Sequence, residues 1–223
     1  MVLSAAAEDY LKTIYKLRSD DEAVTTQAVA ARLEVAPPSA TAMIKKLASM
    51  KLVSHTPYRG VELTPAGEKI ALEVIRHHRL IETYLAEVLG VAWDKVHDEA
   101  ERWEHILSEE VEAKMAEALN HPTRDPHGAP IPALDGTVPR DGWTRLSDAT
   151  PGTLATVRRV SDENGELLRH LSELELVPGS EIEILRAVPA EGVLQLQVKG
   201  QPKTIGAAPA RSVLIEIHEA SEN

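Results

Sequence analysis

Apolar residues recur every three or four positions in three stretches near the N-terminus, which predicts helices over residues 4–18, 25–33 and 38–50. A proline opens the third stretch, where its fixed backbone suits the first turn of a helix. Alternating apolar residues then flank a turn between positions 52 and 63, a pattern typical of a β-hairpin. Three helices followed by a hairpin predict a winged helix-turn-helix domain over residues 1–64.

The next part of the chain has the pattern of two longer amphipathic helices, over residues 65–90 and 93–119. Their apolar positions exceed what one small domain can bury, and a dimer interface is the usual use of such a surplus. We therefore expect a helical dimerisation domain at 65–120, in which Trp103 faces the core.

Beyond residue 120 the helical spacing ends. Residues 121–142 contain five prolines and three glycines, which predicts a linker or extended connection, assigned here to residues 121–149. From residue 150 onward short β-rich stretches alternate with turns and are interrupted by one helical piece, a pattern that predicts an SH3-like barrel at 150–223. The expected fold class is therefore mainly α with a C-terminal all-β domain.

Composition and charge narrow the function. The chain has no cysteine, which excludes disulfides and thiolate metal ligands and fits the reducing cytoplasm. No apolar run approaches the roughly 18 residues of a membrane span. A net charge of −11 argues against nucleic-acid binding, but residues 37–61 hold four basic side chains and no acidic one. A locally basic patch on an acidic chain indicates two different ligands.

The basic side chains fall where a winged helix meets double-stranded DNA, on the third helix and at the tip of the wing. We expect Lys45, Lys46 and Arg59 to contact phosphates, unless they are ordinary solvated surface charges. Ser39 and Thr41 are candidates for phosphate or base contacts, or simply for helix capping. Apolar contacts to thymine methyl groups are expected from two residues at the start of the helix, Pro37 and Pro38.

Residues 96–105, "VHDEAERWEH", carry the densest chemistry. On one continuous helix His97, Glu101, Glu104 and His105 would share an arc of roughly 100° that contains no cation of its own. Such an anionic face is self-repelling unless a cation fills it, although a solvated charged face is the plain alternative. A second pair stands one turn apart on the preceding helix, and Asp9 precedes an apolar stripe. These further candidates are His78, Glu82 and Asp9. The remaining histidines are expected at the surface: His55, His77, His121, His127, His170 and His218.

Four segments together resemble the metal-dependent repressors of the diphtheria toxin repressor family: "EDYLKTIYKL", "HHRLIETYL", "VHDEAERWEH" and "HPTRDPHGAPIP". The resemblance covers nearly the whole chain and implies a homodimer that binds a palindromic operator and represses metal-uptake genes. It also implies a primary metal site made of Asp9, Glu101, Glu104 and His105. An ancillary site is implied at His78, Glu82 and His97, completed from the SH3-like domain by Glu163 and Glu166.

The same resemblance bears on the metal. Iron-responsive members carry methionine where this chain has Asp9 and cysteine where it has Glu101, whereas manganese-responsive members carry carboxylates at both places. Hard oxygen ligands suit Mn²⁺, so we expect Mn²⁺, with Fe²⁺ as the alternative. In the expected mechanism metal fixes a loosely held first helix to the repelling carboxylates and thereby raises operator affinity.

Two other functions fit parts of the sequence. A winged-helix regulator that senses a small organic ligand would leave the acidic face merely solvated. A metallohydrolase could use the same ligands to activate water. No HExxH sequence and no nucleophile motif accompany them, so we expect a protein that is not an enzyme.

Overall fold

The computed structural model describes residues 3–18, 24–56, 60–162, 164–188 and 192–218. These residues fold into two compact units. The first unit comprises residues 1–78, 102–112 and 132–137, and the second unit comprises residues 79–101, 113–131 and 138–223. The domain boundaries expected from the sequence stay predictions, because this division groups residues by their packing.

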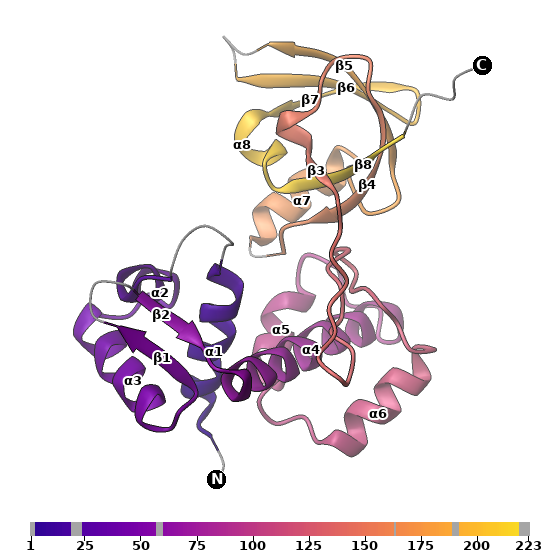
Figure 1. The fold of residues 1–223 in the computed structure, drawn as a ribbon. Coiled ribbons are helices and arrows are strands. Elements are labelled where there is room, and N and C mark those ends of the chain that lie inside the picture. The colour runs from indigo at the N-terminus through magenta and orange to yellow at the C-terminus, as the bar shows by residue number, and fades with distance from the viewer. Residues whose placement is uncertain (1–2, 19–23, 57–59, 163, 189–191, 219–223) are drawn as a thin grey trace. The chain divides into compact units, whose positions relative to one another are not determined.

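The first unit contains the predicted helices and hairpin: α1 (Ala5–Leu17), α2 (Thr26–Arg32), α3 (Pro37–Ser49), β1 (Val53–Thr56) and β2 (Gly60–Leu63) (Figure 1). Ser4 and Thr25 cap the first two helices, because their side chains accept hydrogen bonds from the backbone amides of the first turn. One apolar core joins the helices to β2 through Leu11, Ile44 and Val61, which are fully buried. This arrangement confirms the winged helix-turn-helix. The predicted wing-tip residue Arg59 lies outside the described residues.

The second half of the predicted helical domain is different from the prediction. Helix α4 (Pro65–Glu87) agrees with it, but the expected helix over 93–119 is two helices, α5 (Val96–Trp103) and α6 (Glu109–Ala118). Ser108 starts the second of these, because its carbonyl and hydroxyl accept from amides in the first turn of α6. Glu104 and His105 therefore lie in a turn after α5, and the helical arc drawn through them was wrong.

Several apolar side chains of the helical region are exposed. Trp103, expected in the core, is 37% exposed, and Ile106 is 80% exposed. Others on these helices and loops are also exposed, namely Val88, Leu89, Val111 and Leu134. Only a contiguous apolar patch marks an interface, so these separate positions do not by themselves locate the expected dimer contact. Among the described helices, none combines the length and apolar character needed to cross a bilayer.

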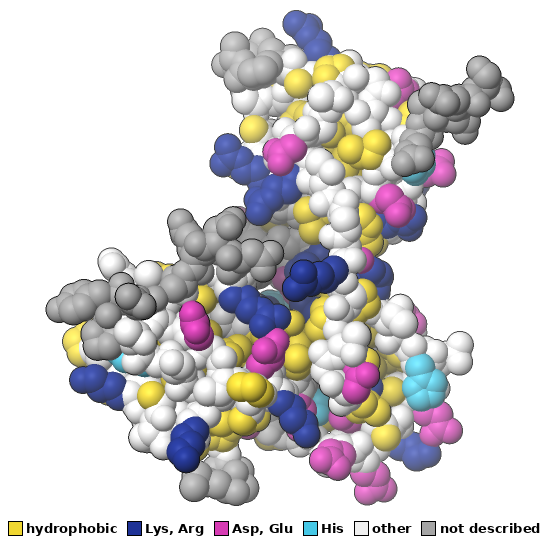
Figure 2. Space-filling view, in the orientation of Figure 1, with side chains coloured by type: hydrophobic (Ala, Val, Ile, Leu, Met, Phe, Trp, Pro, Cys, Tyr) yellow, Lys and Arg dark blue, Asp and Glu magenta, His cyan; other side chains and the backbone are white. Residues whose placement is uncertain are grey.

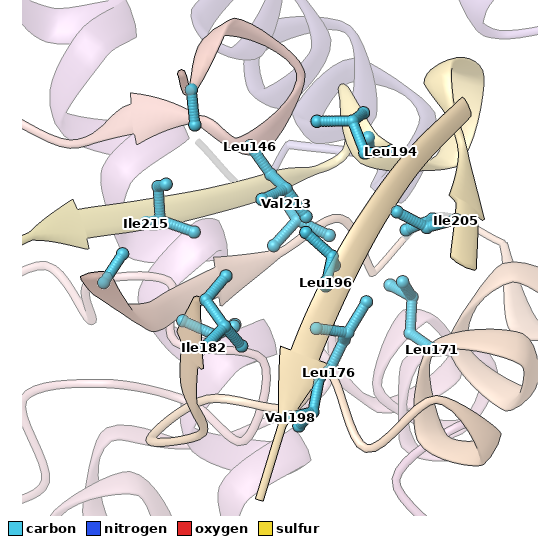
Figure 3. Close-up of a cluster of buried hydrophobic side chains, with 14 of the residues drawn as sticks. Leu146, Leu171, Leu176, Ile182, Leu194, Leu196, Val198, Ile205, Val213 and Ile215 are labelled. Atoms are coloured by element: carbon cyan, nitrogen blue, oxygen red, sulfur yellow. The ribbon is translucent and has the colours of Figure 1, made fainter. Parts of the chain in front are cut away.

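The second unit contains a six-stranded antiparallel sheet in the order β3-β8-β4-β5-β6-β7. The strands are β3 (Thr144–Arg145), β4 (Leu154–Val160), β5 (Glu181–Val188), β6 (Val193–Val198), β7 (Gln201–Gly206) and β8 (Val213–Ile217), with α7 (Gly165–Glu173) and α8 (Ala207–Ala210) between them. Side chains from β5, β6, β8 and α7, among them Ile182, Leu196, Ile215 and Leu171, meet in one apolar core (Figure 3). This confirms the predicted SH3-like domain.

The proline-rich connection is extended, as expected, but it is not a solvated linker. Residues 127–130 are buried, and the carbonyl of His127 accepts a hydrogen bond of 2.9 Å from the amide of Val160 on β4. Gly128 has φ +87°, and a Cβ there would lie 1.9 Å from the carbonyl oxygen of Arg158. Only glycine fits so close a backbone approach. The connection is therefore packed against β4.

Candidate metal centres and nucleic-acid interface

The first unit brings together three ligand-type side chains that we call the first cluster: Asp9, Glu104 and His105. Asp9 lies on α1, and the other two lie in the turn after α5. His105 Nε2 is 2.9 Å from Asp9 Oδ1 and 3.4 Å from Glu104 Oε1. The ligand atoms of all three lie within 4.8 Å of one another. Two carboxylates and an imidazole at this separation are a donor set that suits a divalent first-row cation.

Glu8 lies behind the first cluster and was not predicted. Its Oε2 is 2.7 Å from Nδ1 of His105, while Nε2 of the same ring faces Asp9. Burial alone lowers the pKa of His105, but the hydrogen bond to Glu8 and the charge of Asp9 raise it above its ordinary value. Burial also raises the pKa of Asp9, while His105 opposes that shift. A carboxylate on the far nitrogen of a histidine is the usual way to orient a metal-binding imidazole.

A cation from another helix lies beside Glu104. The Lys12 ammonium donates to both carboxylate oxygens of Glu104 at 2.8 Å, and it lies 3.4 Å from His78 Nδ1. His78 Nδ1 is itself 2.5 Å from Glu104 Oε2. His78 therefore contacts the carboxylate of the first cluster. The face predicted at 97–105 has no cation of its own, as expected, but Lys12 of α1 supplies one to Glu104.

His77 was expected at the surface, and that prediction was wrong. It is buried, and its Nδ1 donates to the backbone carbonyl of Glu104 at 3.2 Å. Its Nε2 lies 3.3 Å from Glu112 Oε2, and Arg76 donates to the other oxygen of Glu112. These contacts hold the turn that carries Glu104, so they position the first cluster from behind.

The second unit contains a group that we call the second cluster: Glu82, Asp125, His127 and Asp162, whose ligand atoms lie within 4.8 Å of one another. Glu82 comes from α4, while Asp125 and His127 come from the proline-rich connection. His97 on α5 borders the cluster, with Nδ1 3.1 Å from Glu82 Oε1 and 3.8 Å from Asp162 Oδ2. His127 was expected at the surface but is fully buried, so that prediction was also wrong.

The buried atoms of the second cluster that make no hydrogen bond within the described residues include Asp125 Oδ2 and His127 Nδ1. The other nitrogen of His127 donates to the carbonyl of Trp93 at 2.9 Å, which leaves Nδ1 directed toward Glu82 Oε2 at 3.9 Å. Asp125 Oδ1 accepts from the amides of His127 and Ala129. Arg79 Nε forms an ion pair with Asp125 Oδ2 at 3.6 Å. Buried polar atoms without hydrogen bonds are costly, and carboxylates with an imidazole are a donor set that fits a bound divalent cation.

Three other predicted ligands are Glu101, Glu163 and Glu166. Glu101 belongs to the second unit, where its carboxylate is 3.8 Å from His97 Nε2. Glu166 is exposed in the first turn of α7 and does not join the second cluster, whereas Asp162 occupies the place expected for it. Glu163 lies outside the described residues. Residues 162–166 contain several acidic residues, and their spacing in the sequence does not indicate which side chain points toward the second cluster.

The predicted DNA-contacting residues line the exposed side of α3. Pro37, Pro38, Ser39, Lys45 and Lys46 are exposed, and Figure 2 shows basic side chains projecting over the helical region that contains α3 (lower left). The helix begins without a side-chain cap, so Ser39 does not cap it. Thr41, in contrast, donates its hydroxyl to the carbonyl of Pro37 at 2.9 Å. The capping alternative thus holds for neither residue, and Thr41 has an intrahelical partner.

Three family models match the chain. Residues 2–61 match the iron dependent repressor, N-terminal DNA binding domain, and residues 64–133 match the iron dependent repressor, metal binding and dimerisation domain. Residues 144–217 match the FeoA domain.

Similar proteins agree with these matches. The chain is 31% identical over 221 residues to the iron-dependent repressor IdeR of Mycobacterium leprae, which covers 94% of this chain and 96% of that protein. It is 36% identical over 188 residues to the diphtheria toxin repressor of Corynebacterium efficiens, with 80% of this chain and 82% of that protein covered. A solved manganese-dependent transcriptional repressor in complex with manganese has a TM-score of 0.88 and 35% identity, over 95% of this chain and 100% of that one.

Proposed function

As a member of the iron-dependent repressor family, this chain is a metal-dependent, DNA-binding transcriptional repressor, and we propose that manganese is the metal to which it responds. It acts as a homodimer on palindromic operator DNA, in the cytoplasm, and controls metal-uptake genes. A regulator that senses a small organic ligand finds no support in these matches, and the relatives are named as repressors and not as hydrolases.

The first cluster carries this proposal, because its ligands come from both matched regions. Asp9 lies in the DNA-binding region, whereas Glu104 and His105 lie in the metal-binding and dimerisation region. A cation bound by all three fixes α1 to the turn after α5. That link orients the recognition helix α3 relative to the dimer partner's copy, so metal binding and operator binding favour each other.

The choice of manganese rests on the donor set. Asp9 and Glu104 offer oxygen, His105 offers nitrogen, and the whole sequence lacks cysteine. Oxygen-rich sites without sulfur suit Mn²⁺ better than softer ions. Glu101 is proposed as a fourth ligand of this site, on the resemblance alone.

Replacement of Glu101 by cysteine tests that fourth ligand. We expect the Glu101→Cys variant to gain affinity for Fe²⁺ and later metals relative to Mn²⁺, because a thiolate replaces a hard oxygen. Metal titrations of operator binding under anaerobic conditions measure the ratio. If the ratio of the affinities for Fe²⁺ and Mn²⁺ is the same in the variant and the wild type, Glu101 is not a ligand of this site.

The second cluster is proposed as a second metal site with Glu82, Asp125, His127 and Asp162 as ligands and His97 at its border. His78 stays a proposed ligand with Glu82 and His97, and its Nδ1 also lies 2.5 Å from Glu104 Oε2. For the operator, Lys45, Lys46 and Arg59 are proposed to contact phosphates, and Pro37, Pro38, Ser39 and Thr41 to lie against the bases or backbone.

Metal removal is the direct test of the proposed function. With Mn²⁺ present we expect operator affinity to rise by about 5- to 150-fold, and a chelator should reverse the gain. Fluorescence anisotropy of labelled operator DNA measures both. The Asp9→Asn variant is the control, because it removes one charged ligand of the first cluster. Operator binding that ignores both chelator and the variant would refute the proposal.

Glu8 supplies a further prediction. The Glu8→Ala variant removes the acceptor for His105 Nδ1 and should weaken Mn²⁺ binding about 10- to 100-fold without removing a ligand. Glu117→Ala, at an exposed acid on α6, is the matched control and should bind normally. Isothermal titration of each variant gives the comparison. Equal affinities would mean that the ring of His105 needs no support from Glu8.

A further inference from the structure

Lys12 is an unusual residue to find beside a metal site. It is 5% exposed, and its ammonium donates to both oxygens of Glu104, whose side chain is fully buried. Lysine is rarely buried unless an acid pairs with it. Lys12 therefore occupies the place at Glu104 that a cation of any kind would favour.

The metal ion and Lys12 would both bind the two carboxylate oxygens of Glu104. A divalent ion in the first cluster needs at least one of them as a ligand, and Lys12 already donates to both at 2.8 Å. An ammonium and a divalent ion at adjacent positions on one buried carboxylate repel each other strongly, because little water screens them. The ion can use Glu104 fully only if the ammonium moves away.

We propose that Lys12 is an intramolecular competitor of the metal for Glu104, and that it sets the metal concentration at which the repressor responds. The proposal rests on the proposed function, since it concerns the affinity of the first cluster. Asp9 and Lys12 are three residues apart on α1 and so lie on the same side of the helix. Without metal, the ion pair of Lys12 with Glu104 holds α1 to the turn after α5. With metal, the ion bound by Asp9 holds α1 there instead.

Direct binding of Mn²⁺ to the full-length protein tests this competition. Free Mn²⁺ is followed by electron paramagnetic resonance for the wild type and for Lys12→Met, Lys12→Arg and Lys114→Met. We expect Lys12→Met to bind Mn²⁺ roughly 5- to 150-fold more tightly, the range typical of coupling between two bound groups. Lys12→Arg keeps the charge and should stay near the wild type. Lys114→Met, at an exposed lysine of α6, should equal the wild type.

The opposite outcome is equally plain. If Lys12→Met binds Mn²⁺ as the wild type does, or more weakly, Lys12 supports the ligand and does not compete with it. If Lys12→Met does not fold, the wild type decides: in its Mn²⁺-soaked crystal, Nζ of Lys12 within about 3 Å of both Glu104 oxygens overturns the proposal. The Asp9→Asn variant separates this question from the proposed function: it should lose the Mn²⁺ bound at the first cluster and keep that of the second cluster. If Asp9→Asn binds Mn²⁺ as the wild type does, the proposed function itself fails.

Discussion

Replacing Glu104 with glutamine is expected to abolish the response of operator binding to Mn²⁺. Glu104 is one of the two carboxylate ligands of the first cluster, and it is also the partner of Lys12. Glutamine leaves the buried ammonium without a counter-charge, which should cost about 3–5 kcal/mol of unfolding free energy. Chemical denaturation measures that loss, and anisotropy of labelled operator DNA measures the lost metal response.

A double variant separates the two effects. Lys12→Met combined with Glu104→Gln removes both buried charges, so most of the lost stability should return. The metal response should stay absent, because the ligand is still missing. If Glu104→Gln alone keeps a normal response to Mn²⁺, the first cluster is not the regulatory site.

Regular elements were the part of this protein that the sequence predicted well. Helices α1, α3 and α4 carry apolar residues at helical spacing with a cap or proline at the start, and both signals are local. The break between α5 and α6 was missed although Ser108 stands there as a helix start. The charged segment 96–105 is also compatible with one long helix. The turn is favoured only by the tertiary contacts of Glu104 and His105.

The candidate sites were predicted in part, for a similar reason. Asp9, Glu104 and His105 were expected together from a resemblance, and the structure places them together. The pair of Lys12 with Glu104 was not predicted, because the sequence around Lys12 does not indicate which acidic residue it contacts. Asp125 and His127 lie in a proline-rich connection with no periodicity, so the sequence gives no sign that they turn inward. The glycine at 128, with its close approach to β4, is the one local signal.

The second cluster should make metal binding depend strongly on pH. Burial alone lowers the pKa of His127, but the contact with Glu82 and the charge of Asp125 raise this pKa to about 9. Burial and the charge of Glu82 raise the pKa of Asp125 to about 6. Both pKa values lie above the ordinary ones, so protonation of these groups stabilises the folded chain at low pH. That stability is lost between pH 3.8 and about 6 for Asp125, and between pH 6.5 and about 9 for His127.

A metal ion requires the deprotonated imidazole, so proton and metal exclude each other at His127 Nδ1. We expect the affinity of the second cluster for Mn²⁺ to rise by up to about tenfold per pH unit between pH 7 and 9, with about one proton released per ion. Calorimetric titrations in buffers of different ionisation enthalpy count that proton. His127→Gln, which has no proton to release, should bind more weakly and lose the slope assigned to this cluster. If the Mn²⁺ affinity of His127→Gln depends on pH as strongly as that of the wild type, the group that releases the proton is not His127.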